Sequence, residues 1–68
     1  MARGRVKWYS AQLGYGFILP DDGGVELLVQ HADIRGGDGF RSIENGADVT
    51  YEPVRGKEGP EAKDVSET

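Results

Sequence analysis

Aromatic and basic side chains are concentrated in the first part of this chain. Residues 1–20 contain three basic residues, no acidic residue and four of the six aromatic residues, Trp8, Tyr9, Tyr15 and Phe17. An exposed ring can stack on another flat ring, and a cation can pair with an anion, so these residue types offer noncovalent binding. The same residues would also suit the core and charged edge of an ordinary strand-rich segment. Which strand face each ring occupies therefore distinguishes a binding surface from an ordinary core.

Groups suited to catalysis are few. The candidates are His31, Ser10, Ser42 and the acidic pair Asp21-Asp22. A lone histidine in a chain without cysteine rarely does acid–base work, and an Asp pair followed by two glycines is typical of a turn. Neither common glycine-rich phosphate-binding pattern fits, because Tyr51 and Leu19 stand where glycine is needed. We predict that the protein is not an enzyme and that it holds neither a cofactor nor a metal ion.

The elements that must position the aromatic residues are short strands. Residues 5–10, 15–19, 25–31, 47–54 and 61–66 have strand-like composition. Turn signals separate them, including Asp21-Asp22-Gly23-Gly24 and Asn45-Gly46, and a long loop is expected over residues 32–43. No segment shows a sustained helical period. These features predict an all-β fold of five strands, closed into a small barrel that protects its edges.

Alternation along these strands predicts which residues face the core. The favoured core set is Val6, Ile18, Leu27, Val29 and Val49, and the favoured outer set is Lys7, Tyr15, Phe17, Leu28 and Gln30. A strict period of two would place Trp8 with Val6, so a bulge or strong twist is needed to bring Trp8 to the outer face. Burying Tyr15 and Phe17 instead would expose Ile18, Leu27 and Val29, which is less favourable. An exposed aromatic patch usually marks an interaction surface.

Length and composition set the limits of the interpretation. The chain has 68 residues, 37% of them hydrophobic, and no cysteine, which predicts one small domain over residues 1–68 without disulfides. No apolar run is long enough to span a bilayer, and we expect a cytoplasmic protein. The net charge of −4 argues weakly against a polyanionic partner. That charge is uneven, however, with +3 on residues 1–20 and −7 on residues 21–68.

The order and spacing of several short motifs resemble those of the bacterial cold-shock proteins, over nearly the whole chain. The motifs are Gly4-Arg5-Val6-Lys7-Trp8-Tyr9, Gly14-Tyr15-Gly16-Phe17-Ile18, Asp21-Asp22-Gly23-Gly24, Gly39-Phe40-Arg41-Ser42-Ile43, Glu44-Asn45-Gly46, and Gly59-Pro60 with Ala62 and Val65. The resemblance implies a five-stranded antiparallel OB-fold barrel that binds single-stranded DNA or RNA. It also implies a monomer that acts as an RNA chaperone or as a regulator of transcription or translation.

The resemblance assigns roles to particular positions. Exposed aromatic residues stack on bases in the family and nearby basic groups meet phosphates, and the matching positions here are Lys7, Trp8, Tyr15, Phe17 and Phe40. The second ribonucleoprotein-like motif, commonly Val-Phe-Val-His-Phe in the family, is Leu-Leu-Val-Gln-His at residues 27–31. It adds Leu28, Gln30 and His31 to the expected nucleic-acid-binding residues.

This chain departs from the family pattern in the same region. Leu13 replaces the usual lysine, Leu28 replaces a stacking phenylalanine, and Glu58 lies in a loop where a basic residue is frequent. The half of the site on the first strand is therefore intact, and the half on the third strand is altered. The alternative interpretation is a degenerate cold-shock barrel with weakened nucleic-acid binding that serves as a protein-interaction module.

Overall fold

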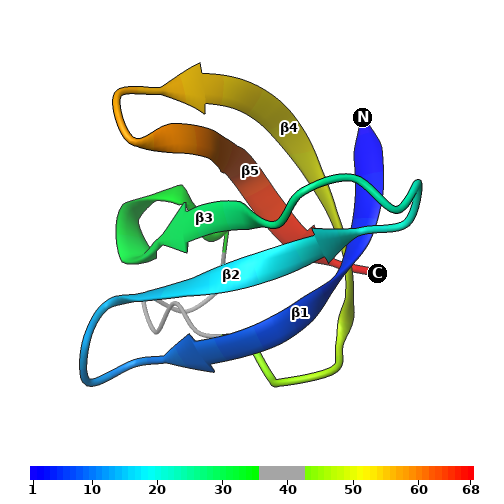
Figure 1. Ribbon diagram of the computed structural model, residues 1–68. Coiled ribbons are helices and arrows are strands. Elements are labelled where there is room, and N and C mark those ends of the chain that lie inside the picture. The colour runs from blue at the N-terminus through cyan, green and yellow to red at the C-terminus, as the bar shows by residue number, and fades with distance from the viewer. Residues whose placement is uncertain (36–42) are drawn as a thin grey trace.

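The computed structural model describes residues 1–35 and 43–68 and shows a five-stranded barrel (Figure 1). The strands are β1 (Ala2–Ser10), β2 (Tyr15–Pro20), β3 (Leu27–Gln30), β4 (Asp48–Gly56) and β5 (Gly59–Glu67), and a single 3-10 turn, η1 (His31–Asp33), follows β3. The predicted all-β fold of five strands is confirmed. The predicted third strand, residues 25–31, is longer than β3, because residues 25 and 26 precede β3 and His31 begins η1.

The strand order around the closed barrel is β1-β2-β3-β5-β4. Four of the five strand pairs are antiparallel, whereas β3 and β5 pair in parallel through Leu28 with Glu61 and Val29 with Ala62. The expectation of a wholly antiparallel barrel is corrected at this pair. An odd number of strands cannot alternate in direction all the way around a closed barrel, so one pair must be parallel.

The turns between the strands follow the local signals in the sequence. In the turn after β2, the backbone N–H of Gly24 donates to Asp22 Oδ1 at 2.9 Å, and Gly23 takes a φ of +83°. In the turn before β4, Gly46 takes a φ of +82° and its N–H donates to the carbonyl oxygen of Val6 at 2.7 Å. The acidic pair Asp21-Asp22 therefore lies in a turn, as its neighbouring glycines predict.

The inside of the barrel is filled by aliphatic side chains and one tyrosine. All five predicted core residues are buried. Among residues 1–35 and 43–68, the buried hydrophobic side chains are Val6, Ile18, Leu27, Val29, Ile34, Ile43, Val49, Tyr51, Ala62 and Val65. Ile34 joins β5 through an isolated parallel bridge to Val65, which closes the core beneath η1. The side of the barrel formed by β1, β2 and β3 carries three of the predicted aromatic residues, Trp8, Tyr15 and Phe17.

Among residues 1–35 and 43–68, no helix is long and apolar enough to cross a membrane. The same residues contain no group of three or more histidine, aspartate or glutamate side chains arranged to hold a metal ion.

Candidate functional site

A bulge in β1 brings Trp8 to the outer face of the barrel. Val6 lies opposite Ile18 in β2, but the register then shifts so that Trp8 lies opposite Phe17. Without this shift, Trp8 would face Gly16 and would share the core side with Val6. The predicted need for a bulge is confirmed, and Lys7 is the residue at which β1 gains its extra position.

The bulge assembles three rings into one cluster. The ring centroids of Trp8 and Tyr15 are 5.5 Å apart, those of Trp8 and Phe17 are also 5.5 Å apart, and those of Tyr15 and Phe17 are 6.3 Å apart. All three pairs have edge-to-face geometry, which is the favourable arrangement for aromatic quadrupoles. We call these three residues the aromatic cluster. The rings hold each other in place while parts of their faces stay open.

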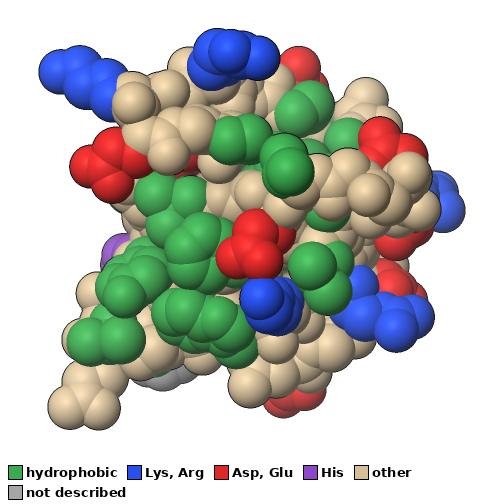
Figure 2. Space-filling model, viewed as in Figure 1, with side chains coloured by type: hydrophobic (Ala, Val, Ile, Leu, Met, Phe, Trp, Pro, Cys, Tyr) green, Lys and Arg blue, Asp and Glu red, His purple; other side chains and the backbone are tan. Residues whose placement is uncertain are grey.

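The aromatic cluster lies on the surface. Tyr15 is 37% exposed, and Trp8 and Phe17 are partly exposed. Figure 2 shows hydrophobic side chains gathered in one patch over the β1 and β2 side of the barrel, with charged side chains beside it. The prediction that Tyr15 and Phe17 point outward is confirmed.

Two glycines allow this arrangement. Gly14 ends the β1–β2 connection with a φ of +81°, a backbone conformation that favours glycine. Gly16 lies between Tyr15 and Phe17 and is buried against β1, where an added Cβ would lie 2.6 Å from the Cα of Tyr9. The absence of a side chain at residue 16 therefore lets β1 and β2 approach closely directly beneath the rings.

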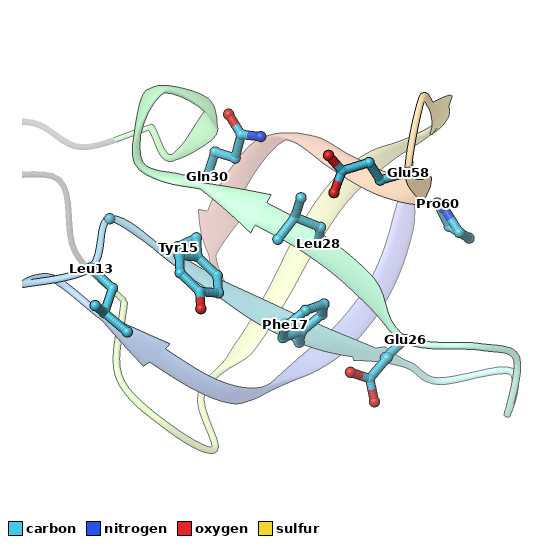
Figure 3. A pocket seen from close by; sticks show the side chains of 9 residues that line it. Leu13, Tyr15, Phe17, Glu26, Leu28, Gln30, Glu58 and Pro60 are labelled. Atoms are coloured by element: carbon cyan, nitrogen blue, oxygen red, sulfur yellow. The ribbon is translucent and has the colours of Figure 1, made fainter.

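A groove of about 580 Å³ lies beside the aromatic cluster, between β2, β3 and the β4–β5 hairpin. It is lined by Leu13, Gly14, Tyr15, Phe17, Glu26, Leu28, Gln30, Glu58 and Pro60. In Figure 3 the side chains of Tyr15 and Phe17 from β2 and of Leu28 and Gln30 from β3 stand side by side along the groove. Their backbones pair directly, Tyr15 with Gln30 and Phe17 with Leu28.

The charges at this site are mainly acidic. Lys7 Nζ donates to Glu26 Oε1 at 2.9 Å, so the basic residue at the β1 bulge already has an anionic partner. Both side chains are partly exposed, 46% for Lys7 and 38% for Glu26, so the attraction between them is moderated by water. Glu58 adds a second carboxylate to the groove.

Most predicted site residues lie together. Trp8, Tyr15 and Phe17 form the aromatic cluster, and Leu28 and Gln30 line the groove next to it. Lys7 lies at the edge of the groove, where it is hydrogen-bonded to the lining residue Glu26. His31 is exposed at the start of η1, outside the groove lining, and its backbone N–H donates to the carbonyl oxygen of Gly14 at 2.9 Å. Phe40 lies outside the described residues.

Sequence reasoning did not assign Glu26 and Pro60 to the site. Glu26 is two residues before Leu28 and four before Gln30, so alternation alone indicated that it shares their face. Its ion pair with Lys7 depends on how β1 and the β2–β3 turn meet in space, which no local pattern reveals. Pro60 reaches the groove only because β5 pairs with β3.

Comparison with known proteins identifies the family. Residues 2–68 match the sequence model of the 'Cold-shock' DNA-binding domain. The chain belongs to the cold-shock domain family. It is 41% identical over 66 residues to a cold shock protein of Arthrobacter globiformis, covering 97% of both chains. It is 45% identical over 65 residues to cold shock protein CspB of Geobacillus stearothermophilus, covering 96% of both.

Cold-shock domains also occur within longer chains. Glycine-rich protein 2 of Nicotiana sylvestris is 50% identical over 58 residues, which is 85% of this chain and 27% of the plant protein. The closed five-stranded barrel agrees with the OB fold expected of a cold-shock domain. Membership of the family supports nucleic-acid binding as the general function of this chain.

Proposed function

We propose that the aromatic cluster binds single-stranded RNA or DNA by stacking on its bases. The observation that carries this proposal is the arrangement of Trp8, Tyr15 and Phe17, three partly exposed rings within 6.3 Å of one another on two paired strands. An aromatic side chain on a rigid strand can stack on any base, with a contribution of about 1–3 kcal/mol per base. A duplex hides the faces of its bases, so the cluster should prefer single strands.

The groove extends the proposed binding surface. Leu28 and Gln30 continue the line of side chains from Tyr15 and Phe17 onto β3, so a strand that stacks on the cluster can place further bases there. The Gln30 amide has both donors and an acceptor for a base edge. Lys7 contributes a cation beside the rings, and His31 and Phe40 are the remaining proposed contacts.

The same binding would give the protein a role as an RNA chaperone. A protein that holds bases unpaired lowers the free energy of the melted strand, which opposes secondary structure in RNA. This effect can in turn regulate transcription or translation. We propose that the protein acts in this way as a monomer in the cytoplasm.

Fluorescence of Trp8, the single tryptophan of the chain, tests the proposal. A mixed-sequence single strand within the roughly 4–16 nucleotides that one OB fold covers should quench the fluorescence at micromolar concentration or below. The duplex of the same sequence should quench it much less. Equal quenching by both, or no quenching by either, would contradict stacking on the aromatic cluster.

A protein-binding role is the second candidate. Leu13 is 62% exposed at one end of the groove, and the groove lining is largely apolar, which would also suit a peptide. Absence of quenching by the single strand in the same titration would favour this role.

A further inference from the structure

The groove beside the aromatic cluster has an unusual charge for a surface that meets a polyanion. None of the nine residues that line it is basic, and two of them, Glu26 and Glu58, carry carboxyl groups. Phosphate groups would be repelled from such a lining. A bound strand must therefore turn its bases into the groove and keep its backbone outside.

The two carboxylates of the groove differ in what they contact. Glu26 accepts a hydrogen bond from Lys7 at 2.9 Å, so its charge is already paired. For Glu58, no hydrogen bond or ion pair is present among residues 1–35 and 43–68. Figure 3 shows its carboxylate directed from the β4–β5 hairpin over β3, toward Leu28. Glu58 thus presents an open acceptor at the wall of the groove.

An acceptor at this position distinguishes bases by their edges. Leu28 lies directly opposite Phe17 in the β2–β3 ladder, so a base that stacks on Phe17 and contacts Leu28 brings its edge toward Glu58. A carboxylate can only accept hydrogen bonds. At ring position C4, cytosine carries the N4 amino group, which can donate to the carboxylate, whereas thymine and uracil carry the O4 carbonyl oxygen, a second acceptor. The N3–H donor of thymine and uracil lies one ring position away from this substituent, so the selection depends on the C4 substituent meeting Glu58.

From this arrangement we infer that the groove selects bases with an exocyclic amino group, and cytosine over uracil in particular, through a hydrogen bond to Glu58. The inference rests on the proposed function, because it names the ligand class of the same surface. Cytosine and uracil have the same ring size and similar stacking surfaces. A difference between them therefore reports on the hydrogen bond at the base edge.

The experiment compares oligodeoxycytidine with oligodeoxyuridine of equal length, by Trp8 quenching at mildly alkaline pH where cytosine is unprotonated. Wild-type protein should bind the cytidine strand at least about fivefold more tightly, as expected for one hydrogen bond to a charged acceptor. The variant Glu58→Ala should bind both strands with a ratio near one. The variant Glu52→Ala removes the same charge from an exposed position of β4 outside the groove and should keep the wild-type ratio.

The possible results distinguish a failure of the cytosine preference from a failure of base stacking itself. Equal affinity for the two strands in the wild type, tighter binding of the uridine strand, or an unchanged ratio in Glu58→Ala would each overturn the inference while leaving stacking intact. A loss of preference in both alanine variants would assign it to net charge and also overturn the inference. If neither strand quenched Trp8 in the wild type, the proposed function itself would be contradicted, and the inference with it.

Discussion

At the scale of single residues, the site places partly exposed rings beside carboxylates, which would repel phosphates. In the proposed binding mode, stacking by Trp8, Tyr15 and Phe17 would contribute roughly 3–9 kcal/mol in total before the costs of ordering the strand. The cation at the β1 bulge, Lys7, is paired with Glu26 at 2.9 Å. Contacts between rings and bases should therefore contribute more to affinity than contacts between cations and phosphates.

Removal of one ring tests the contribution of stacking. We expect Phe17→Ala to weaken binding of a single strand by more than about 1 kcal/mol, because it deletes the ring that pairs with Trp8 across β1 and β2. Fluorescence titration measures the loss, and circular dichroism checks that the barrel remains folded. Leu19→Ala is the matched control, since Leu19 is exposed on the same face of β2 but lies outside the groove. Equal affinities of Phe17→Ala and the wild type would show that the binding face is misassigned.

Removal of the partner of Lys7 tests the role of charge. In Glu26→Gln, the Lys7 ammonium loses its anionic partner and becomes available to a phosphate. We expect tighter binding of single strands at low salt, and a plot of log K against log salt steeper by about 0.7. The double variant Glu26→Gln with Lys7→Gln should return to the shallower slope. An unchanged slope in the single variant would mean that Lys7 does not reach the nucleic acid.

At the scale of the elements, the bulge in β1 determines the site. The bulge moves Trp8 from the face that carries Val6 to the face that carries Phe17. Gly16 in β2 has no side chain, which allows β1 and β2 to approach closely beneath the rings. Past the bulge, the backbone N–H of Tyr9 donates to Asn45 Oδ1 at 2.9 Å. This side-chain acceptor fixes the end of β1 against the turn that leads into β4.

A methyl group at residue 16 should disturb this junction. In Gly16→Ala the added Cβ would overlap the carbonyl oxygen of Trp8 and lie 2.6 Å from the Cα of Tyr9, and neither backbone atom can move without shifting β1. We expect a loss of about 1–3 kcal/mol in the free energy of unfolding, measured by urea denaturation. Gly24→Ala is the control, because its nearest contact is the end of the exposed Asp22 side chain at 3.2 Å. Equal stability of both variants would contradict the tight packing beneath the rings.

At the scale of the whole molecule, three titrating groups link stability to alkaline pH. Burial raises the pKa of the Tyr51 hydroxyl in the core, and nearby Asp22 and Asp21 raise it further. Burial also raises the pKa of Tyr9. A hydrogen bond to Asp33 is the main cause that raises the pKa of Lys63, which joins β5 to η1 at 3.1 Å.

The sign of the effect is the same for all three groups. Each holds its proton more tightly in the folded state, so its contribution to stability is complete below the ordinary pKa, 10.0 for tyrosine and 10.5 for lysine. We expect the free energy of unfolding to fall as the pH rises above about 10. Urea denaturation across this range measures the fall, and Tyr51→Phe should make it smaller. A stability that stays constant to about pH 11 would contradict this linkage.

The sequence predicted most of the barrel and the half of the site on β2. Alternation places Ile18 inside and Tyr15 and Phe17 outside, because β2 is regular. It could not locate the bulge at Lys7, since a bulge depends on pairing with another strand. In β5, Ala62 and Val65 are both buried although they are three residues apart, which breaks the alternation and accompanies the positive φ of Asp64.

The charge of the groove differs from the charge of the sequence segment that holds the rings. Residues 1–20 supply the +3 segment that holds the rings, but residues 21–68, net −7, supply Glu26 and Glu58 at the groove. Position along the chain therefore did not predict the charge of the surface. The folded barrel brings acidic residues from later segments next to the aromatic cluster.

The salt dependence of single-strand binding tests most directly whether stacking, rather than phosphate contact, provides the affinity. Trp8 quenching gives the binding constant of one mixed-sequence single strand over a series of salt concentrations. With at most about two phosphates neutralised, log K should fall against log salt with a slope near −1.4 or shallower. A slope steeper than about −4 would require more than about five phosphate contacts and would contradict binding led by the aromatic cluster.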